Sequence, residues 1–243
     1  MMEPTAPTSA SPSRSSGLWR LFAPAPAIPV ALKDPVEIDA AYRRWRQRVL
    51  LTTIVGYALF YFVRKNLSVA MPVMGKDLGI TKADLGLFLT LHGLLYGVAR
   101  FVNGFLADRA NARTFMAVGL AASALMNVFF GLGSAVVTLG LVWMLNGWVQ
   151  GMGFPPVSHL MTHWFPPKQL ATKQSIWNTS HSIGGGLVAK ACGVIMGLGA
   201  IGAANQGVGM WRWCFWAMAI LGAAGFLLML FWLPGTPKEE GLP

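Results

Sequence analysis

Acidic residues are scarce in this sequence. Its 243 residues include 9 Asp and Glu against 19 Lys and Arg, and only 12% of the residues are charged while 54% are hydrophobic. Soluble domains carry about a quarter charged residues, so this composition excludes an ordinary soluble protein. The apolar residues fall in blocks of about 20 residues, the length that a helix needs to cross a bilayer. The chain is therefore predicted to be an integral membrane protein.

Several other kinds of chemistry are also missing. The two cysteines, Cys192 and Cys214, lie in apolar segments without metal-ligand spacing, which is typical of small packing residues. No nucleophile–base pair and no metal constellation are visible, so we expect neither an enzyme nor a cofactor. The net charge of +10 does not indicate nucleic-acid binding, because no such module is visible and basic residues normally flank membrane spans on the cytoplasmic side.

The first part of the chain is not expected to be a signal sequence. Residues 1–41 are rich in Pro, Ser and Ala, and their best apolar stretch, Leu18–Leu32, is interrupted by prolines. This pattern predicts a disordered cytoplasmic tail and no cleaved signal. Residues 42–233 are expected to form the membrane domain, and residues 234–243 to begin a central cytoplasmic loop.

Six apolar blocks predict an all-α fold with six transmembrane helices. Their approximate bounds are 49–71, 85–107, 114–133, 136–158, 174–196 and 211–233. Lys and Arg concentrate before the first block, between the second and third, and between the fourth and fifth. By the positive-inside rule, both termini are cytoplasmic and the protein spans the inner (plasma) membrane several times.

Glycines and prolines mark two features of these spans. Pairs spaced four residues apart, which allow helices to approach closely, occur at Gly93 and Gly97 and at Gly147 and Gly151. The run Gly151–Pro156 predicts a break in the fourth span, because prolines and glycines interrupt a helix where neighbours satisfy the freed backbone groups.

The expected spans contain cations and no Asp or Glu. The ionisable residues within them are Arg64, Lys65, His92, Arg100, His181 and Lys190. A charge in the hydrocarbon region is costly, so each such residue is a functional hypothesis. Because no carboxylate is present to pair with them, the missing counter-ion is predicted to be an anionic ligand.

Helical spacing places some of these cations on shared stripes with aromatic and polar residues. The stripes are Tyr57–Tyr61–Arg64, His92–Tyr96–Arg100–Asn103 and Trp177–His181 with the glycines that follow it. An Arg guanidinium offers a planar fork for phosphate or carboxylate oxygens, and a Tyr hydroxyl can extend such a site. Histidine titrates near neutral pH and could respond to a bound anion.

The remaining cations have simpler interpretations. Lys65 lies about 100° around the helix from Arg64, which favours snorkelling or capping over binding. Lys190 lies on the face opposite His181 and is interpreted in the same way. His92 either bonds to a neighbouring helix or belongs to the stripe.

Several stretches resemble one known family. "YFVRKNLSVAMP", "YGVARFVNGFLADRAN", "NGWVQGMGFPP" and "SIWNTSHSIGGG" are similar to helices one, two, four and five of the organophosphate:phosphate antiporters, a family of the major facilitator superfamily. The run Gly104–Arg113 resembles the superfamily's loop between helices two and three. The similarity extends from Tyr42 to the end of the chain.

This resemblance implies roles for particular residues. Arg64 matches the arginine that binds phosphate, and the other expected substrate-binding residues are Tyr57, Tyr61, Tyr96, Arg100 and His181. Asp108, Arg109 and Arg113 match elements of a cytoplasmic gate.

The family has twelve helices in two halves, and this chain resembles the N-terminal half. We therefore expect a truncated or split half, whose partner is the missing C-terminal half, a second half-chain or a second copy of itself. The implied function is exchange of a phosphate ester (sugar phosphate, glycerol phosphate or phosphoglycerate) for inorganic phosphate by alternating access. Two alternatives stay open: a hexose-phosphate sensor acting through a partner kinase, and a structural or assembly subunit.

Overall fold

The computed structural model of the chain describes residues 22–30, 34–202 and 209–243, and these residues form helices and no strand. The main helices are α2 (Pro35–Leu78), α3 (Lys82–Ala107), α4 (Ala112–Leu132), α5 (Val136–Gln150), α6 (Phe154–Trp164), α7 (Pro167–Gly202) and α8 (Trp213–Trp232). Two short 3-10 helices, η1 (Met210–Arg212) and η2 (Pro237–Glu240), precede and follow α8. The predicted all-α architecture is therefore observed.

The number of membrane crossings is a separate question. Among the described residues, four segments are long and apolar enough to cross a membrane: Lys82–Ala107, Ala112–Leu132, Pro167–Leu198 and Met210–Trp232. The other two expected spans correspond to α2, whose apolar sequence contains two adjacent cations, and to α5 and α6 together. α5 alone has 15 residues, fewer than the roughly 20 that a crossing needs. Six crossings therefore stay a prediction.

α2 begins earlier than the expected end of the tail. The side chain of Asp34 accepts a hydrogen bond of 2.9 Å from the N–H of Val36, and Pro35 occupies the first helical position. Asp before a helix and Pro at its first position are strong start signals. A boundary placed by hydrophobicity alone, after residue 41, overlooks them. The tail residues 1–21 and 31–33 lie outside the described residues.

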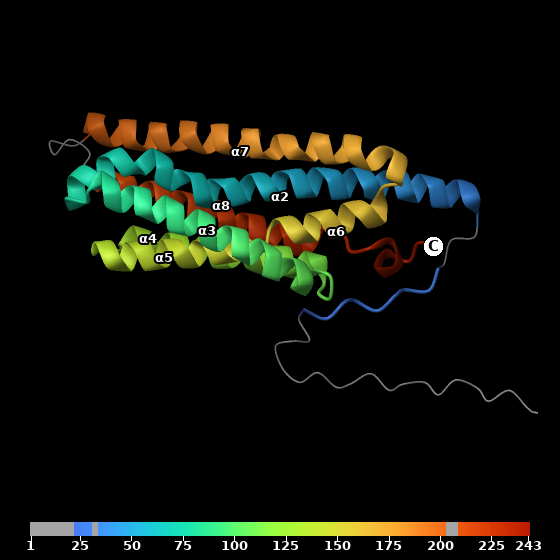
Figure 1. Cartoon of the computed structure of the whole chain (residues 1–243). Helices are drawn as coiled ribbons and strands as arrows, with labels where there is room; N and C mark the ends of the chain where they lie inside the picture. Colours follow the sequence, from blue (N-terminus) through green and yellow to red (C-terminus); the bar gives the residue numbers. More distant parts are fainter. Residues whose placement is uncertain (1–21, 31–33, 203–208) are drawn as a thin grey trace, which may run out of the picture.

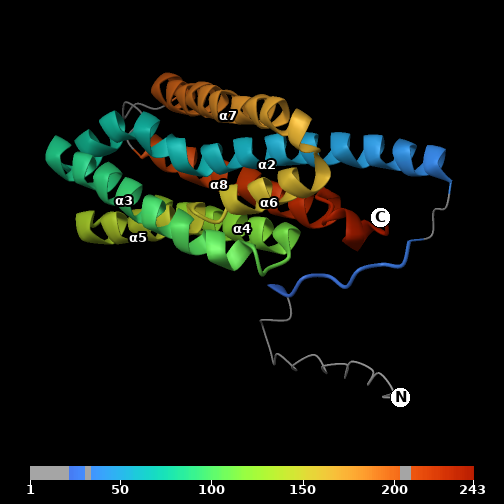
Figure 2. The same ribbon diagram turned by 45° about the vertical axis from the view of Figure 1, so that its right-hand side comes forward.

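α2 lies at the centre of the bundle. It packs along α7 and α8, while α8 also packs on α4, α4 on α5, and α5 on α3. Figures 1 and 2 show this order, with α7 along one edge of the bundle and α5 on the opposite side. As a result α2 has one face that side chains from both α3 and α7 reach.

The predicted break in the fourth span is confirmed. α5 ends at Gln150, and α6 begins at Phe154 after the turn Gly151–Gly153, with a proline in its first turn. A Cβ on Gly147 would fall 2.8 Å from the carbonyl oxygen of His92, and one on Gly151 would fall 2.8 Å from an α3 alanine side chain. This glycine pair therefore allows α5 to lie directly against α3, as its spacing predicts.

The second glycine pair differs from its prediction. A Cβ on Gly93 or Gly97 would meet no other described residue within 4 Å. The prediction of close helix packing there is wrong within this chain, because these two glycines lie on a side of α3 against which no described helix packs.

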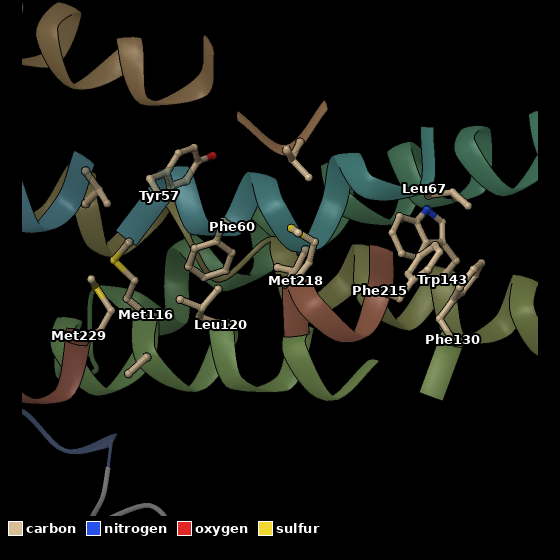
Figure 3. Close-up of a cluster of buried hydrophobic side chains, with 14 of the residues drawn as sticks. Tyr57, Phe60, Leu67, Met116, Leu120, Phe130, Trp143, Phe215, Met218 and Met229 are labelled. Carbon is tan, nitrogen blue, oxygen red and sulfur yellow. The ribbon is translucent and has the colours of Figure 1, made fainter. Parts of the chain in front are cut away.

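The apolar core lies between α2, α4, α5 and α8. Phe60 points from α2 toward Leu120 and Met116 of α4, whereas Tyr57 lies on the other side of α2 (Figure 3). Trp143 and Phe215 continue the core toward the other end of the bundle. One side of α2 is thus fixed by packing, and the opposite side carries the polar stripe Tyr57–Tyr61–Arg64.

A buried amide network holds α2 from the core side. The amides of Asn127 and Asn146 both donate to the carbonyl oxygen of Val63, over 2.8 and 3.0 Å. The amide of Gln150 donates to the carbonyl oxygen of Phe60 over 3.2 Å. Both carbonyls belong to residues directly before members of the polar stripe, so the network fixes the rotation of α2 at the stripe.

The first and last described segments meet at one end of the bundle (Figure 1). The N–H of Ile28 donates to the carbonyl oxygen of Lys238 over 3.0 Å, and the hydroxyl of Tyr42 donates to the carbonyl oxygen of Pro243. The indole N–H of Trp164 donates to the carbonyl oxygen of Gly235 over 2.8 Å. The residues expected to begin a central loop are therefore packed against the helices.

Candidate functional site

The arginine of the α2 stripe is held between aromatic rings. The guanidinium carbon of Arg64 lies 4.3 Å from the centroid of the Tyr61 ring and 4.9 Å from that of the Tyr96 ring. These are cation–π distances, and they restrict the orientation of the guanidinium without using its N–H donors. No hydrogen bond joins these donors to another of the described residues, so they stay available to a ligand.

α3 supplies the second wall of the site. Tyr96 and Arg100 lie one turn apart, and the hydroxyl oxygen of Tyr96 is 3.4 Å from that of Tyr57 on α2. The guanidinium carbon of Arg100 lies 3.6 Å from the centroid of the Phe154 ring, at the start of α6. Both arginines of the site thus rest on aromatic faces.

α7 supplies the third wall. The ring centroid of His181 lies 4.9 Å from that of Tyr57, 5.1 Å from that of Tyr61 and 5.3 Å from that of Trp177. Its Nδ1 lies 2.7 Å from the carbonyl oxygen of Asn178. A carbonyl only accepts, so Nδ1 carries the proton and Nε2 is left for another partner.

A glycine brings α7 this close. A Cβ on Gly184 would fall 2.6 Å from the carbonyl oxygen of Ala58 and 2.8 Å from the Cβ of Tyr61. Any other residue would push α7 away from α2, so Gly184 sets the distance of His181 from the two tyrosines.

The structure brings together all six residues that the sequence singles out as substrate-binding. These residues are Tyr57, Tyr61, Arg64, Tyr96, Arg100 and His181. Sequence reasoning missed Phe154, which joins Arg100 to Trp177 through ring contacts. The only available signal was its position directly after the glycine break. Lys65 is exposed, yet it lines a cavity beside Arg64.

The site is positively charged. Within the described ranges, neither Arg64 nor Arg100 forms a salt bridge, and the two salt bridges observed there lie elsewhere. No cluster of three potential metal ligands occurs in the same part of the chain. Two arginines beside tyrosine hydroxyls, without a carboxylate, suit an anion with several oxygens.

Two cavities adjoin the arginines. One, of about 340 Å³, is lined by Arg64, Tyr96 and His92 among others. The second, of about 400 Å³, extends from Arg100 to Asp108 and His159. The site therefore has open space on both sides of the central tyrosines.

The three residues expected to form a gate lie apart from this cluster. Arg113 forms a salt bridge of 3.0 Å with Glu240 of η2. Asp108 caps the end of α3 and lies 3.8 Å from Nδ1 of His159 on α6. Arg109 is exposed. The end of α3 thus lies against α6, and the start of α4 is tied to η2 near the end of the chain.

His159 lies just beyond the fourth expected span. Its burial lowers the pKa of the imidazole below the ordinary 6.5, and the neighbouring His163 acts in the same direction. The carboxylates of Asp108 and Glu239 oppose that shift. The net direction favours a neutral imidazole at neutral pH, so the 3.8 Å contact with Asp108 is not a full ion pair.

Comparison with known proteins gives a consistent picture. The sequence model of the Major Facilitator Superfamily matches residues 53–243. The chain is 36% identical over 226 residues to the "Probable hexose phosphate transport protein" of Chlamydia pneumoniae, covering 93% of this chain and 48% of that protein. The "Glycerol-3-phosphate transporter" of Bacillus subtilis (strain 168) is 37% identical, with 93% and 49% covered.

A relative of another kind is equally similar. The "Membrane sensor protein UhpC" of Escherichia coli (strain K12) is 37% identical, covering 91% of this chain and 48% of that protein. Among solved structures, a bacterial homolog of the human lysosomal transporter Spinster, in an inward-facing and occupied conformation, matches with a TM-score of 0.68 at 21% identity. That match covers 79% of this chain and 45% of the other, and it concerns the fold alone. The chain thus spans about half the length of these proteins.

Proposed function

Because the chain belongs to the Major Facilitator Superfamily, a family of membrane transporters and not of enzymes, we propose that it carries half of the binding site of a phosphate-ester transporter. The observation that carries the proposal is Arg64, which is held by two tyrosine rings and has no carboxylate partner among the described residues. The substrate would be a sugar phosphate, glycerol phosphate or phosphoglycerate.

The geometry supports a division of roles. Arg64 would bind phosphate oxygens through its guanidinium fork, and the hydroxyls of Tyr57 and Tyr96 would donate to the same group. Arg100 would attract the anion from the cavity that it lines toward α6. His181 contacts both α2 tyrosines and would respond to occupancy of the site. Once protonated, its Nε2 would donate a hydrogen bond to the bound anion.

Transport would proceed by alternating access, with inorganic phosphate as the counter-substrate. The polar face of α2 between α3 and α7 would be closed by a second six-helix unit, related to this one by an axis along the membrane normal. That unit is a C-terminal half, a separate half-chain or a second copy of this chain. Asp108, Arg109 and Arg113 would form the gate at the cytoplasmic end.

The location follows from the same reasoning. An integral protein of the inner membrane agrees with the apolar helices and with the relatives. The distribution of Lys and Arg supports placing both termini, and hence the gate, in the cytoplasm.

Binding tests the proposal directly. The purified chain in nanodiscs should bind glucose 6-phosphate, glycerol 3-phosphate or inorganic phosphate, as measured by calorimetry, while sulfate-free buffer without ligand serves as the baseline. Proteoliposomes containing the chain, alone or with a co-expressed second half, should then exchange external ester for internal labelled phosphate. Absence of any phosphate binding would contradict the proposal.

One observation favours a second function. The similarity to a membrane sensor protein supports a receptor that binds hexose phosphate and signals through a partner kinase. Such a receptor would use the same residues. Binding without measurable exchange, together with ligand-dependent capture of a histidine kinase encoded nearby, would support the sensor over the transporter.

A further inference from the structure

Two buried ring nitrogens near the site have no partner. His92 on α3 is only 7% exposed and Trp143 on α5 only 1%, and their rings stack with centroids 5.2 Å apart at 26°. Neither Nε2 of His92 nor Nε1 of Trp143 forms a hydrogen bond with any described residue. Buried polar atoms are nearly always paired, so two unpaired atoms on stacked rings call for an explanation.

The hydrogen-bonding character of each nitrogen can be assigned. Nδ1 of His92 lies 3.0 Å from the carbonyl oxygen of Trp143. Because a carbonyl only accepts, Nδ1 must donate, and Nε2 of a neutral imidazole is then an acceptor. The indole Nε1 of Trp143 can only donate. The stacked pair thus leaves one free acceptor and one free donor.

Both residues line the same cavity as the phosphate-binding arginine. This cavity, of about 340 Å³, is also lined by Arg64, Lys65 and Tyr96. Two cations and no carboxylate line it. Arg64 and Lys65 have only donors to offer, and the Tyr96 hydroxyl already faces that of Tyr57. The exposed hydroxyl of Ser68 also lines this cavity. His92 Nε2 adds a buried nitrogen acceptor to a cavity whose charged side chains offer only donors.

A phosphate group needs donors, and the arginine provides them. An alcohol hydroxyl needs a donor and an acceptor together, because it donates one hydrogen and accepts through its lone pairs. The free Nε1 of Trp143 and the free Nε2 of His92 match that requirement. Inorganic phosphate at Arg64 has no carbon-bound hydroxyl to present to them.

We propose that His92 and Trp143 form a hydroxyl-binding subsite that recognises the organic part of a phosphate ester whose phosphate is held by Arg64. The subsite determines specificity: it favours polyhydroxylated esters over esters with a plain alkyl chain, and it leaves the affinity for inorganic phosphate unaffected. This inference rests on the proposed function.

The test examines the hydrogen-bonding roles of the two ring nitrogens of His92 separately. His92→Asn keeps an amide N–H near the position of Nδ1, where it can donate to the Trp143 carbonyl, but places nothing at the position of Nε2. His92→Gln places an amide oxygen near the position of Nε2. Calorimetry on the full chain in nanodiscs compares glycerol 3-phosphate and glucose 6-phosphate with propyl phosphate, which has no hydroxyl, and with inorganic phosphate.

The wild-type chain should bind at least one hydroxylated ester about tenfold or more tightly than propyl phosphate, because a site built for a hydroxyl rejects an analogue that lacks it. His92→Asn should remove most of that preference and change the affinity for inorganic phosphate less than about twofold. His92→Gln should recover part of the preference. Trp143→Phe keeps an aromatic ring and removes the donor, so it should also weaken the binding of hydroxylated esters. This variant replaces His92→Asn in the test if His92→Asn does not fold.

The possible failures are distinguishable. If the wild-type chain binds no phosphate compound, the proposed function fails and the subsite fails with it. If the wild-type chain prefers hydroxylated esters and both His92→Asn and Trp143→Phe keep that preference, the subsite alone is overturned. A loss of inorganic phosphate binding in a folded His92→Asn variant would indicate that His92 positions Arg64 and does not bind a ligand hydroxyl. This result would also overturn the subsite.

Discussion

The hydroxyl oxygen of Tyr57 lies 3.4 Å from that of Tyr96, and this contact joins α2 to α3 directly beside Arg64. Both rings are held by their neighbours: Tyr57 packs on Trp177 with centroids 4.7 Å apart, and the Tyr96 ring lies against the Arg64 guanidinium. The hydroxyls are therefore positioned by ring packing and do not depend on their long mutual contact.

Removing one hydroxyl should affect binding more than folding. We expect Tyr96→Phe to weaken phosphate binding by about tenfold, because hydrogen bonds to charged groups are worth roughly 1.5–3 kcal/mol. The melting temperature should change little, since the ring packing is retained. Calorimetry and thermal unfolding of the same sample measure both effects, and unchanged affinity would exclude Tyr96 from the ligand site.

Replacing the central arginine by lysine tests the need for a planar fork. Arg64→Lys keeps the charge but loses bidentate donation and the ring contacts, so we expect phosphate affinity to fall by at least about tenfold and exchange to disappear. Lys190→Arg, on an exposed part of α7, is the matched control and should leave binding intact. Retained exchange in the Arg64→Lys variant would contradict the assigned role.

Two glycines on α7 provide an internal comparison. Gly184→Ala would place a Cβ 2.6 Å from the carbonyl oxygen of Ala58, whereas a Cβ on Gly186 would meet no described residue within 4 Å. Gly184→Ala should therefore destabilise the protein by about 1–3 kcal/mol through overpacking and weaken ligand binding by displacing His181. Gly186→Ala should be neutral or slightly stabilising, because alanine favours helices. Equal melting temperatures for the two variants would show that α7 is not held where it contacts α2.

The α2 stripe and the glycine pairs show which features of this protein can be predicted from its sequence and which cannot. Helical spacing predicts that Tyr57, Tyr61 and Arg64 share a face, and the absence of carboxylates predicts an unpaired cation there. Both depend only on local geometry and composition. The spacing at Gly93 and Gly97 predicted a helix contact equally well, but no described helix packs there, because which faces meet is decided by the whole bundle.

The residues that complete the site depend on this tertiary arrangement. Phe154 faces Arg100 only because α5 breaks at Gly151–Gly153 and α6 starts again in a new direction. His92 carried two possible interpretations in the sequence, a bond to a neighbouring helix or membership of the stripe. The structure shows the bond to Trp143, and the free Nε2 became visible only once the partner of Nδ1 was known.

The amide network behind α2 should contribute to stability. Asn146→Leu would remove a donor to the carbonyl of Val63 and leave the buried hydroxyl of Ser123 without its 2.8 Å acceptor. Leaving buried polar groups unpaired costs about 1–3 kcal/mol, so the melting temperature should fall clearly. Gln47→Ala, on an exposed part of α2, is the control. A similarly small change in both variants would show that the network is dispensable.

Acidification should destabilise the end of the bundle that carries His159. Burial lowers the pKa of this imidazole below its ordinary 6.5, so the unfolded chain binds the proton more readily than the folded one. Its contribution to stability is therefore complete above about pH 6.5 and declines as the pH falls through the folded-state pKa. We expect the melting temperature to drop between pH 7.5 and 5, and His159→Gln to reduce that drop.

Asp108→Asn removes a carboxylate that supports the protonated ring, so it should make the drop steeper. Identical pH profiles for the wild-type chain and His159→Gln would show that acid sensitivity arises elsewhere, whereas the opposite effects of the two substitutions would place it at the contact between α3 and α6.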